Sequence, residues 1–301
     1  DADLVADIKA TRINSRYLPD ITLPERIGLS ADLPAPVAQA GLILVATPSG
    51  AFRSVLKQLP GLNQRVPVIW VCKGFETGTM KLPHQVAQEE LPDNVPRGVL
   101  SGPSFAQEVA TGLPTALTLA TNDTSSLREA AAALHCDRLR VYTSNDVIGV
   151  ELGGALKNVI ANAAGISYGL HFGHNARAAL ITRGVAEISR LGLALGGQME
   201  TFMGLTGMGD LILTCTGELS RNYTVGKQLG QGRRLQDILS EMRMVAEGIK
   251  TAKSVYNLSR KIGVEMPICH EIYHILYDDA SPKEALQRLM TRDLKHELDE
   301  L

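Results

Sequence analysis

Apolar and polar residues in the first half of the chain alternate in a pattern that predicts buried strands separated by helices. Residues 41–46 and 66–72 form continuous apolar runs rich in branched side chains, typical of strands buried on both faces in a parallel sheet. Further β runs lie at 99–101, 115–120 and 139–143, and helical patterns lie at about 51–59, 81–90, from 104, and 125–134. The alternation predicts a doubly wound α/β domain that binds ligands at the carboxyl ends of its strands.

After about Asn145 the β pattern stops and only helical patterns follow. A long helix is expected from Val147 towards Ala164, and Asn175 is the expected N-cap of the next one. Later helices are expected at 245–262, at 268–277, and from Ser281, where S-P-K-E forms a capping box. We therefore predict a dinucleotide-binding domain over residues 1–145 and an all-α substrate domain over 146–301.

The beginning of the chain shows a helical pattern, D-A-D-L-V-A-D-I-K, before any strand of the sheet. A G-x-G-x-x-G sequence, whose glycines let a backbone approach a pyrophosphate, is absent. We expect that the first βαβ unit, roughly 30 residues, precedes Asp1 and is missing from the sequence as given. The dinucleotide-binding domain is then N-terminally incomplete.

Composition excludes several classes of protein. The chain has 301 residues, of which 45% are apolar and 21% charged, as in a folded globular protein. A net charge of −2 argues against sequence-independent binding to nucleic acid or to an anionic membrane. No apolar run approaches the roughly 18 residues of a membrane-spanning helix, so we expect no stable membrane insertion. Four widely separated cysteines form no disulfide pattern, which favours a reducing cytoplasm.

Two candidate site segments follow predicted strands. Lys73 comes directly after the strand at 66–72, where a cation would face both a nicotinamide ring and an anionic substrate. Gly102-Pro-Ser104-Phe follows the strand at 99–101, and Ser104 with Gln107 forms a capping box, which would leave helix N-terminal amides facing the cleft. The alternatives are a solvated turn lysine and a helix cap without further function.

Lys157 is a candidate general base on the long helix. Helical spacing places it with Asn158 on a strip of small residues that includes Gly154, opposite an apolar side formed around Leu156. Desolvation and a second cation such as Lys73 would lower the pKa of this lysine towards neutrality. An exposed surface lysine is the alternative.

A third group of polar residues suits a phosphate ester. Asp210 ends Gly-Met-Gly-Asp, and Ser220, Arg221 and Asn222 follow. The arginine offers a forked set of donors, and its two neighbours add neutral donors. The alternative is a solvated loop that carries ordinary charges.

Two other features carry less weight. His171-x-x-His174 lies beside two glycines and has no nearby acid to complete a ligand set, so no metal site is expected. Cys215 has no adjacent cation or histidine in the sequence, which favours a small core residue.

Six motifs together carry a resemblance to a known family: C-K-G-F-E, S-G-P-S-F-A-Q-E, G-V-E-L-G-G-A-L-K-N-V-I-A, N-A-R-A-A-L-I-T-R-G, G-M-G-D-L-I-L-T-C-T and S-R-N. In this order and spacing, from about Tyr17 to near Arg292, the chain resembles the bacterial-type NAD(P)-dependent glycerol-3-phosphate dehydrogenases. The resemblance implies a Rossmann-type domain, NAD or NADP as the cofactor, and a small phosphorylated substrate. It also implies interconversion of sn-glycerol 3-phosphate and dihydroxyacetone phosphate, which supplies phospholipid synthesis in the cytoplasm.

The resemblance also implies roles for individual residues. Lys157 would be the proton acceptor, and Lys73 would contact both substrate and cofactor. The other implied substrate-binding residues are Gly102, Ser104, Asp210, Ser220, Arg221 and Asn222. The other implied cofactor-binding residues are Ala106, Arg221, Val245 and Glu247.

Two alternatives stay open at this point. One is a dehydrogenase of the β-hydroxyacid type, which would not need Arg221 for a phosphate. The other is a catalytically silent binding protein, which a natural absence of the glycine-rich loop would favour. The apolar character of the helical domain is compatible with a homodimer.

Overall fold

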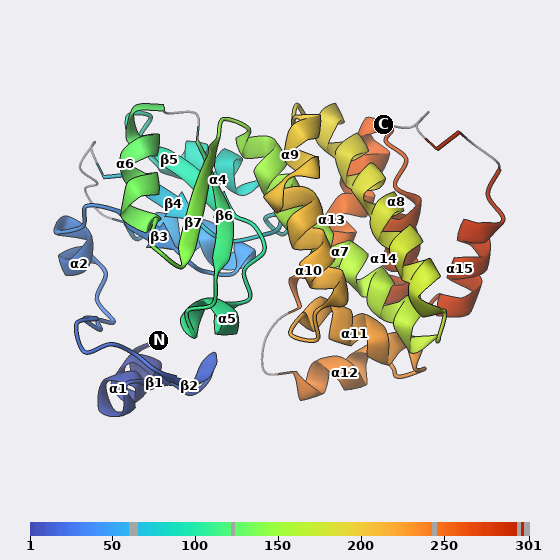
Figure 1. Cartoon of the computed structure of the whole chain (residues 1–301), viewed down its shortest axis with the longest axis horizontal. Helices are drawn as coiled ribbons and strands as arrows, with labels where there is room; N and C mark the ends of the chain where they lie inside the picture. Colours follow the sequence, from blue (N-terminus) through green and yellow to red (C-terminus); the bar gives the residue numbers. More distant parts are fainter. Residues whose placement is uncertain (60–65, 122–123, 243–245, 294–295, 298–301) are drawn as a thin grey trace.

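The computed structural model describes residues 1–59, 66–121, 124–242, 246–293 and 296–297. A five-stranded sheet with its helices lies beside a larger, entirely helical part (Figure 1). The last strand of the sheet ends at Ser144, and the first helix of the helical part begins at Val147. Among the helices described, none is both long and apolar enough to cross a membrane.

The sheet has the strand order β3-β4-β5-β6-β7. Its strands are β3 (Ile43–Val45), β4 (Val68–Trp70), β5 (Arg97–Ser101), β6 (Thr115–Thr121) and β7 (Leu139–Ser144). Neighbouring strands are parallel except β5 and β6, which pair antiparallel. The doubly wound α/β prediction is confirmed, with this difference: the short helix α5 (Ala106–Ala110) does not carry the chain back across the sheet, so β6 runs back beside β5.

Alternate residues of β4 face the two layers that cover the sheet. Trp70 packs on one side with residues of α3 (Phe52–Leu56), α4 (Pro83–Glu90) and the start of the first long helix. Ile69 packs on the other side with residues of α6 (Thr124–Leu134) and the neighbouring strands. The expectation that β3 is also buried on both faces is wrong, because Leu44 is 46% exposed. In the sheet that the structure describes, β3 is an edge strand and has less cover.

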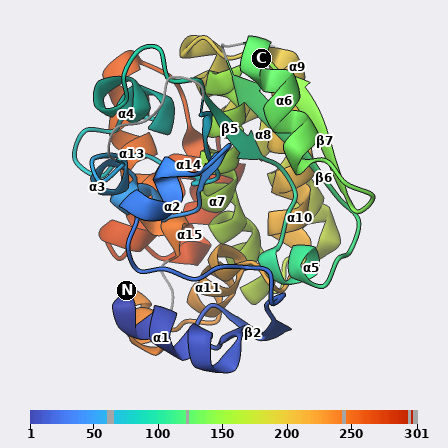
Figure 2. The ribbon, with the colours of Figure 1, turned by 90° about the vertical axis from the view of Figure 1, so that its left-hand side faces the viewer.

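The N-terminal helical pattern forms α1 (Ala2–Thr11), whose N-cap Asp1 accepts a hydrogen bond from the Leu4 amide. A small antiparallel sheet of β1 (Ile13–Asn14) and β2 (Leu18–Thr22) follows, which the sequence analysis did not predict. These elements lie below the main sheet in both views (Figure 2). The chain then passes through α2 (Pro34–Ala38) to β3.

The long helix α7 (Val147–Gly169) forms the core of the helical part, and all its residues except Ile148 and Tyr168 are buried. The prediction of one apolar side and one ligand-facing strip was therefore too simple. The small residues on the second side admit neighbouring helices as well as the site. An added Cβ on Gly226 of α11 (Arg221–Gly230) would lie 2.1 Å from the carbonyl oxygen of Asn162 on α7.

The remaining helices of this part pack either against α7 or against one of its neighbours. They are α8 (Gly173–Ala194), α9 (Met199–Met203), α10 (Asp210–Thr216), α12 (Leu235–Glu241), α13 (Glu247–Ile262), α14 (Pro267–Tyr277) and α15 (Pro282–Met290). Ser281 caps α15 as predicted. Asn175 does not cap α8, because the helix already begins at Gly173, after a turn in which His171 has a positive φ.

Candidate active site

Three charged residues meet where the sheet adjoins the helical part. Asp210, which is fully buried, accepts a hydrogen bond from Lys157 Nζ with one carboxylate oxygen. The other oxygen accepts from Lys73 Nζ at 2.6 Å. Two ammonium groups therefore share one carboxylate, although the three residues are far apart in the sequence.

Each of the three residues is positioned by a different element. Lys73 lies three residues beyond the end of β4, at the edge of the sheet where parallel α/β proteins bind ligands. Lys157 lies near the middle of α7. Asp210 is the first residue of α10 and follows one turn of π-helix, Leu205–Gly209, a helix type that occurs often at functional sites.

The pKa of Lys157 is lowered from 10.5 to about 8. Burial is the largest cause, because it penalises the charged amine, and the positive charge of Lys73 adds to it. Asp210 acts in the opposite direction, since its negative charge stabilises the ammonium. A neutral amine is thus populated near neutral pH, as a general base requires.

The Gly102–Ser104 segment lies beside Lys73. Lys73 Nζ donates to the Gly102 carbonyl at 3.0 Å, and Ser104 Oγ donates to the same carbonyl at 3.1 Å. The predicted capping box is wrong: Phe105 is the N-cap of α5, and the helix begins at Ala106. The Ser104 hydroxyl cannot cap the helix while it is directed to Gly102. Ala106 is the first residue of α5, five residues beyond the end of β5.

Ser220, Arg221 and Asn222 lie at the start of α11. Ser220 is the N-cap, and its hydroxyl accepts from the Tyr223 amide at 3.2 Å. Arg221 is exposed, whereas the Asn222 side chain is buried and donates to Asn158 Oδ1 at 2.9 Å. Asn222 Oδ1 in turn accepts from the Gly248 amide. Asn222 thereby joins α11 to α7, next to Lys157, and to α13.

Glu247 begins α13 and spans from the helical part to the sheet. Its Oε1 accepts from the backbone amide of Ser49, just beyond β3, at 3.0 Å. Burial raises the pKa of Glu247, against the lowering effects of the Ser49 bonds and the positive charge of Arg221. Val245, the other residue that the resemblance assigned near this position, lies outside the described residues.

Two buried hydroxyl oxygens near the strand ends fit a dinucleotide. Thr47 Oγ1 follows β3, Ser101 Oγ ends β5, and both atoms lack a hydrogen-bond partner among the described residues. A dinucleotide laid across the carboxyl ends of parallel strands brings many polar groups to such positions. The residues present are compatible with NAD or NADP.

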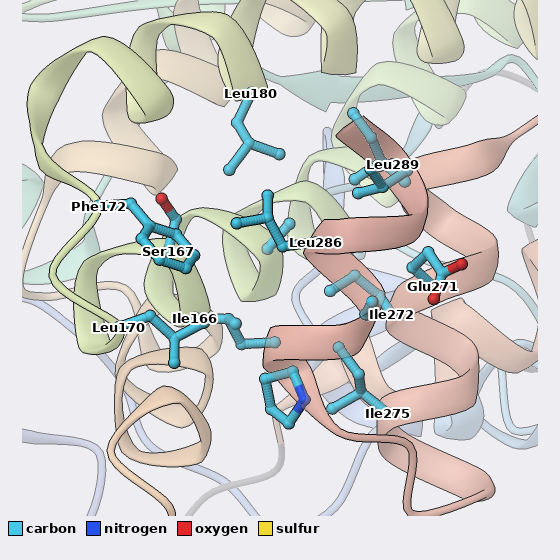
Figure 3. Close-up of a pocket in the computed structure, with 14 residues that line it drawn as sticks. Ile166, Ser167, Leu170, Phe172, Leu180, Glu271, Ile272, Ile275, Leu286 and Leu289 are labelled. Carbon is cyan, nitrogen blue, oxygen red and sulfur yellow. The ribbon is translucent and has the colours of Figure 1, made fainter. Parts of the chain in front are cut away.

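A separate, partly open hollow lies among α7, α8, α14 and α15 (Figure 3). Leu180, Leu286 and Phe172 are among its lining side chains. The acidic lining residue, Glu271, is paired with Arg288. The hollow offers no cation for a phosphate and includes none of Lys73, Lys157 and Asp210.

The two other sequence features lie elsewhere. His171 is in the turn before α8, and His174 Nδ1 lies 2.8 Å from Arg177 Nη2. No group of three potential metal ligands occurs within the described ranges. Cys215 is fully buried in the helical core, and burial raises its pKa to about 12.

Two buried carboxylates were not singled out from the sequence. Glu151 on α7 bonds to residues of β4 and α4, and Glu187 on α8 accepts from the Ile268 and Cys269 amides at the start of α14. The available signal was an acid within an apolar helical run, as in G-V-E-L-G-G. Such an acid needs buried partners.

Family models cover most of the chain. The model described as the NAD-dependent glycerol-3-phosphate dehydrogenase N-terminus matches residues 1–127, and the model of the C-terminus matches residues 146–287. The chain belongs to the NAD-dependent glycerol-3-phosphate dehydrogenase family. This confirms the family that the six motifs indicated.

Individual members of the family are similar over nearly the whole chain. Glycerol-3-phosphate dehydrogenase [NAD(P)+] of Nitrosospira multiformis is 54% identical over 294 residues, which are 98% of this chain and 88% of that protein. The protein of the same name from Dechloromonas aromatica is 52% identical over 99% of this chain and 91% of its own length.

A solved structure confirms the fold. Glycerol-3-phosphate dehydrogenase from Coxiella burnetii superposes with a TM-score of 0.92 at 41% identity, over 97% of this chain and 90% of that one. A D-mandelate dehydrogenase complex with NADH superposes with a TM-score of 0.57 at 12% identity, over 95% of this chain and 89% of that one, and shares the fold alone. This low sequence identity therefore gives no support to the alternative of a β-hydroxyacid dehydrogenase.

Proposed function

We propose that this protein interconverts sn-glycerol 3-phosphate and dihydroxyacetone phosphate with NAD or NADP, and so supplies glycerol phosphate for phospholipid synthesis. The observation that carries the proposal is the pair of lysines bonded to the buried Asp210. An alcohol oxidation needs a base for the hydroxyl proton and a positive charge beside the oxygen, and the two lysines offer both.

Lys157 is the proposed proton acceptor. With its pKa at about 8, its neutral Nζ takes the proton from the C2 hydroxyl, and in the reverse direction its ammonium returns that proton. Lys73 would lie next to the same oxygen and stabilise the developing alkoxide. Asp210 holds both amines in place. Bound NAD or NADP would supply the hydride acceptor.

The start of α11 is the proposed phosphate site. Arg221 has a forked set of donors, the Ser220 hydroxyl can donate, and the first amides of α11 favour an anion. Gly102, Ser104 and Asn222 complete the proposed substrate-binding set. An exposed arginine beside a buried acid–base cluster suits a substrate whose phosphate is more accessible than its carbinol carbon.

The proposed cofactor contacts are Lys73, Ala106, Arg221, Val245 and Glu247. Support comes from the position of Lys73 and Ala106 after the ends of neighbouring strands and from the bond of Glu247 to the Ser49 amide beyond a third strand. These three strand ends form the edge where a doubly wound sheet binds a dinucleotide.

The decisive experiment is Lys157→Ala. Loss of the base is expected to lower kcat by two or more orders of magnitude with substrate binding retained. Lys227→Met is the matched control, because Lys227 lies over the Tyr168 ring in the same part of the molecule and should keep wild-type kcat. Near-normal turnover in Lys157→Ala would contradict the assignment. Activity on a substrate without phosphate, undiminished in Arg221→Ala, would favour a β-hydroxyacid dehydrogenase instead.

We further propose a domain boundary between residues 145 and 146, a cytoplasmic location and a homodimer. The boundary is supported by the step from β7 to α7, and the location by the small phosphorylated substrate. Exposed apolar side chains on the helical part, among them Met203, Ile212 and Leu219, support self-association. Sedimentation velocity measures the oligomeric state directly, and a monomer at all concentrations would contradict the dimer.

A further inference from the structure

Glu151 places a buried carboxylate at the junction of three elements. Its side chain is 1% exposed. Oε1 accepts from Trp70 Nε1 on β4 and from the backbone amide of His84 on α4, each at 2.8 Å. Oε2 shares a hydrogen bond of 2.5 Å with His84 Nδ1. Both carboxylate oxygens are therefore bonded to the sheet side of the molecule, although Glu151 belongs to α7.

The two partners of Glu151 flank the segment that carries Lys73. Trp70 ends β4 three residues before this lysine, and His84 lies in the first turn of α4, after the segment. Glu151 itself lies six residues before Lys157 on the same helix, a rise of about 9 Å. The Glu151 carboxylate thus bonds to both ends of the 70–84 segment, which carries Lys73, from the helix that carries the proposed base.

We infer that Glu151 is a positioning residue that sets the separation between the Lys73 and Lys157 amines by holding the 70–84 segment against α7. This inference rests on the roles proposed above for the two lysines. It adds a residue that touches neither substrate nor cofactor and acts through Trp70 and His84.

The contact between α7 and the Lys73 side chain is close enough for this positioning to matter. An added Cβ on Gly154, one helical turn before Lys157, would lie 3.3 Å from Lys73 Cγ and 2.9 Å from Ser101 Oγ. The stem of Lys73 therefore passes directly over the α7 backbone. A shift of the segment relative to α7 changes where its ammonium lies, and misplacement by about 1 Å can cost a hundredfold in rate.

Burial of the Glu151 carboxylate costs free energy. Removal from water raises the pKa of Glu151, against the lowering effect of the His84 and Trp70 bonds. A buried carboxylate stabilises a fold only weakly compared with an apolar side chain of the same volume. Its directional bonds, by contrast, specify one register between two parts of the molecule.

The first variant is Glu151→Met, which keeps the volume and removes all three bonds. We expect kcat/KM to fall by about a hundredfold and the pKa of Lys157 to rise by about one unit, because Lys73 then lowers it less. Lys73, Asp210 and Cys215 are the titratable groups that act on Lys157. Competitive acetylation of the individual lysines across neutral and alkaline pH, read by peptide mass spectrometry, measures this pKa without any activity assay.

The direction of the pKa shift separates positioning from a direct charge effect. Loss of a negative charge at residue 151 would by itself lower the pKa of Lys157, because an anion stabilises the ammonium. An upward shift therefore cannot come from the lost charge, and it is the direction expected when Lys73 moves away from Lys157. In oxidation of the alcohol, the same shift moves the limb of the pH–rate profile that depends on a neutral Lys157 to higher pH.

Glu151→Gln is the rescue variant. Its amide oxygen can accept from Trp70 and the His84 amide, and its amide nitrogen can donate to a neutral His84 Nδ1. We expect near wild-type kcat/KM and no upward shift in the pKa of Lys157. Glu187→Met is the matched control: it deletes another buried carboxylate that accepts two backbone amides, away from Lys73, so it should lower stability without a change in the pKa of Lys157.

If Glu151→Met does not fold, the same quantities can be measured on Trp70→Phe and His84→Ala. Each removes one bond, and each should shift the pKa of Lys157 upward by less. Trp70 is the single tryptophan of the chain, so its fluorescence emission reports in Glu151→Met and Glu151→Gln whether its contact with residue 151 has changed.

Two outcomes overturn distinct claims. If the wild type interconverts glycerol 3-phosphate and dihydroxyacetone phosphate and Lys157→Ala does not, but none of Glu151→Met, Trp70→Phe and His84→Ala raises the pKa of Lys157, the positioning role fails alone. If the wild type has no such activity, the proposed function fails, whereas the labelling result still reports on the geometry.

Discussion

The Asp210 carboxylate opposes the two largest effects on the Lys157 amine. Asp210 lies between two amines, and its charge opposes the effect of burial and of Lys73 on Lys157. The resulting pKa of about 8 is the outcome of opposing contributions, each of which one substitution removes. The direction in which a substitution of a neighbouring charged residue shifts the pKa of Lys157 can therefore be predicted.

Asp210→Asn should shift the pKa of Lys157 downward, since it removes the contribution that raises it. The limb of the pH–rate profile that depends on neutral Lys157 should move to lower pH, which is the opposite of the shift expected in Glu151→Met. The value of kcat should fall, because the two lysines lose their shared acceptor. Asp146→Asn, a buried N-cap of α7 that bonds the Gly149 and Gln198 amides, is the control and should leave the limb in place. A limb that moves to higher pH would contradict this account.

Glu187 should give the free energy of unfolding a pH dependence of its own. Burial raises its pKa from 4.5 to about 7, so between these values the folded state holds a proton that the unfolded state has lost. Stability then falls as pH rises through this window, by on the order of 3 kcal/mol. Urea unfolding of the wild type and Glu187→Gln across this range tests the difference, and parallel profiles would exclude it.

At the scale of elements, α7 and α11 approach each other through glycines. Added Cβ atoms on Gly165 and Gly226 would lie 2.1 Å from the carbonyl oxygens of Tyr223 and Asn162, respectively. Each added Cβ would clash with a backbone atom, which cannot rotate away as a side chain can. A side chain at either glycine would therefore force the two helices apart. This close approach brings Asn222 to Asn158, next to the proposed base.

Gly226→Ala should destabilise the protein by about 1–3 kcal/mol, the usual cost of overpacking a core. It should also lower kcat, because separation of α11 from α7 moves the start of α11 relative to Lys157. Gly28→Ala, which meets nothing within 4 Å, is the control and should leave both quantities unchanged. Thermal unfolding and steady-state kinetics measure the pair, and equal melting temperatures would contradict the predicted clash.

The sequence predicted elements well where one pattern dominates. Continuous apolar runs identified β3 and β4, and helical spacing identified α7 and α8. It failed at Ser104, whose hydroxyl bonds Gly102 rather than capping a helix, and at the antiparallel β6. Both depend on the direction that the chain takes after a strand, which local patterns do not encode.

At the scale of the whole molecule, the site exists only where the two parts meet. Asp210 was grouped from the sequence with the proposed phosphate-binding residues, and the resemblance placed it among the substrate-binding residues. Its bonds to Lys73 and Lys157 were not predicted, because it lies 53 residues beyond Lys157 in the sequence. Glu247 and Ser49 are separated by 198 residues and form another link. Partners so distant in sequence have no local signature.

Glu247→Ala should weaken cofactor binding. It removes a buried acceptor of the Ser49 amide, and a hydrogen bond to a charged group contributes about 1.5–3 kcal/mol. We expect KM for NAD or NADP to rise about tenfold or more, with a smaller change in KM for glycerol 3-phosphate. Ser49→Ala keeps the backbone bond and should have a weaker effect. Equal changes in both KM values would argue against a specific link to the cofactor.

The burial of α7 on all sides has a kinetic consequence for the native state. Its backbone amides should be among the last to exchange with solvent deuterons, because they are released only when the whole helical core opens. The amides between Cys72 and Leu82 lie in a segment without helix or strand and should exchange sooner. Lys157 thus lies in a helix that opens rarely, and Lys73 lies in a segment that opens more often. A bound ligand should therefore slow amide exchange chiefly around Lys73.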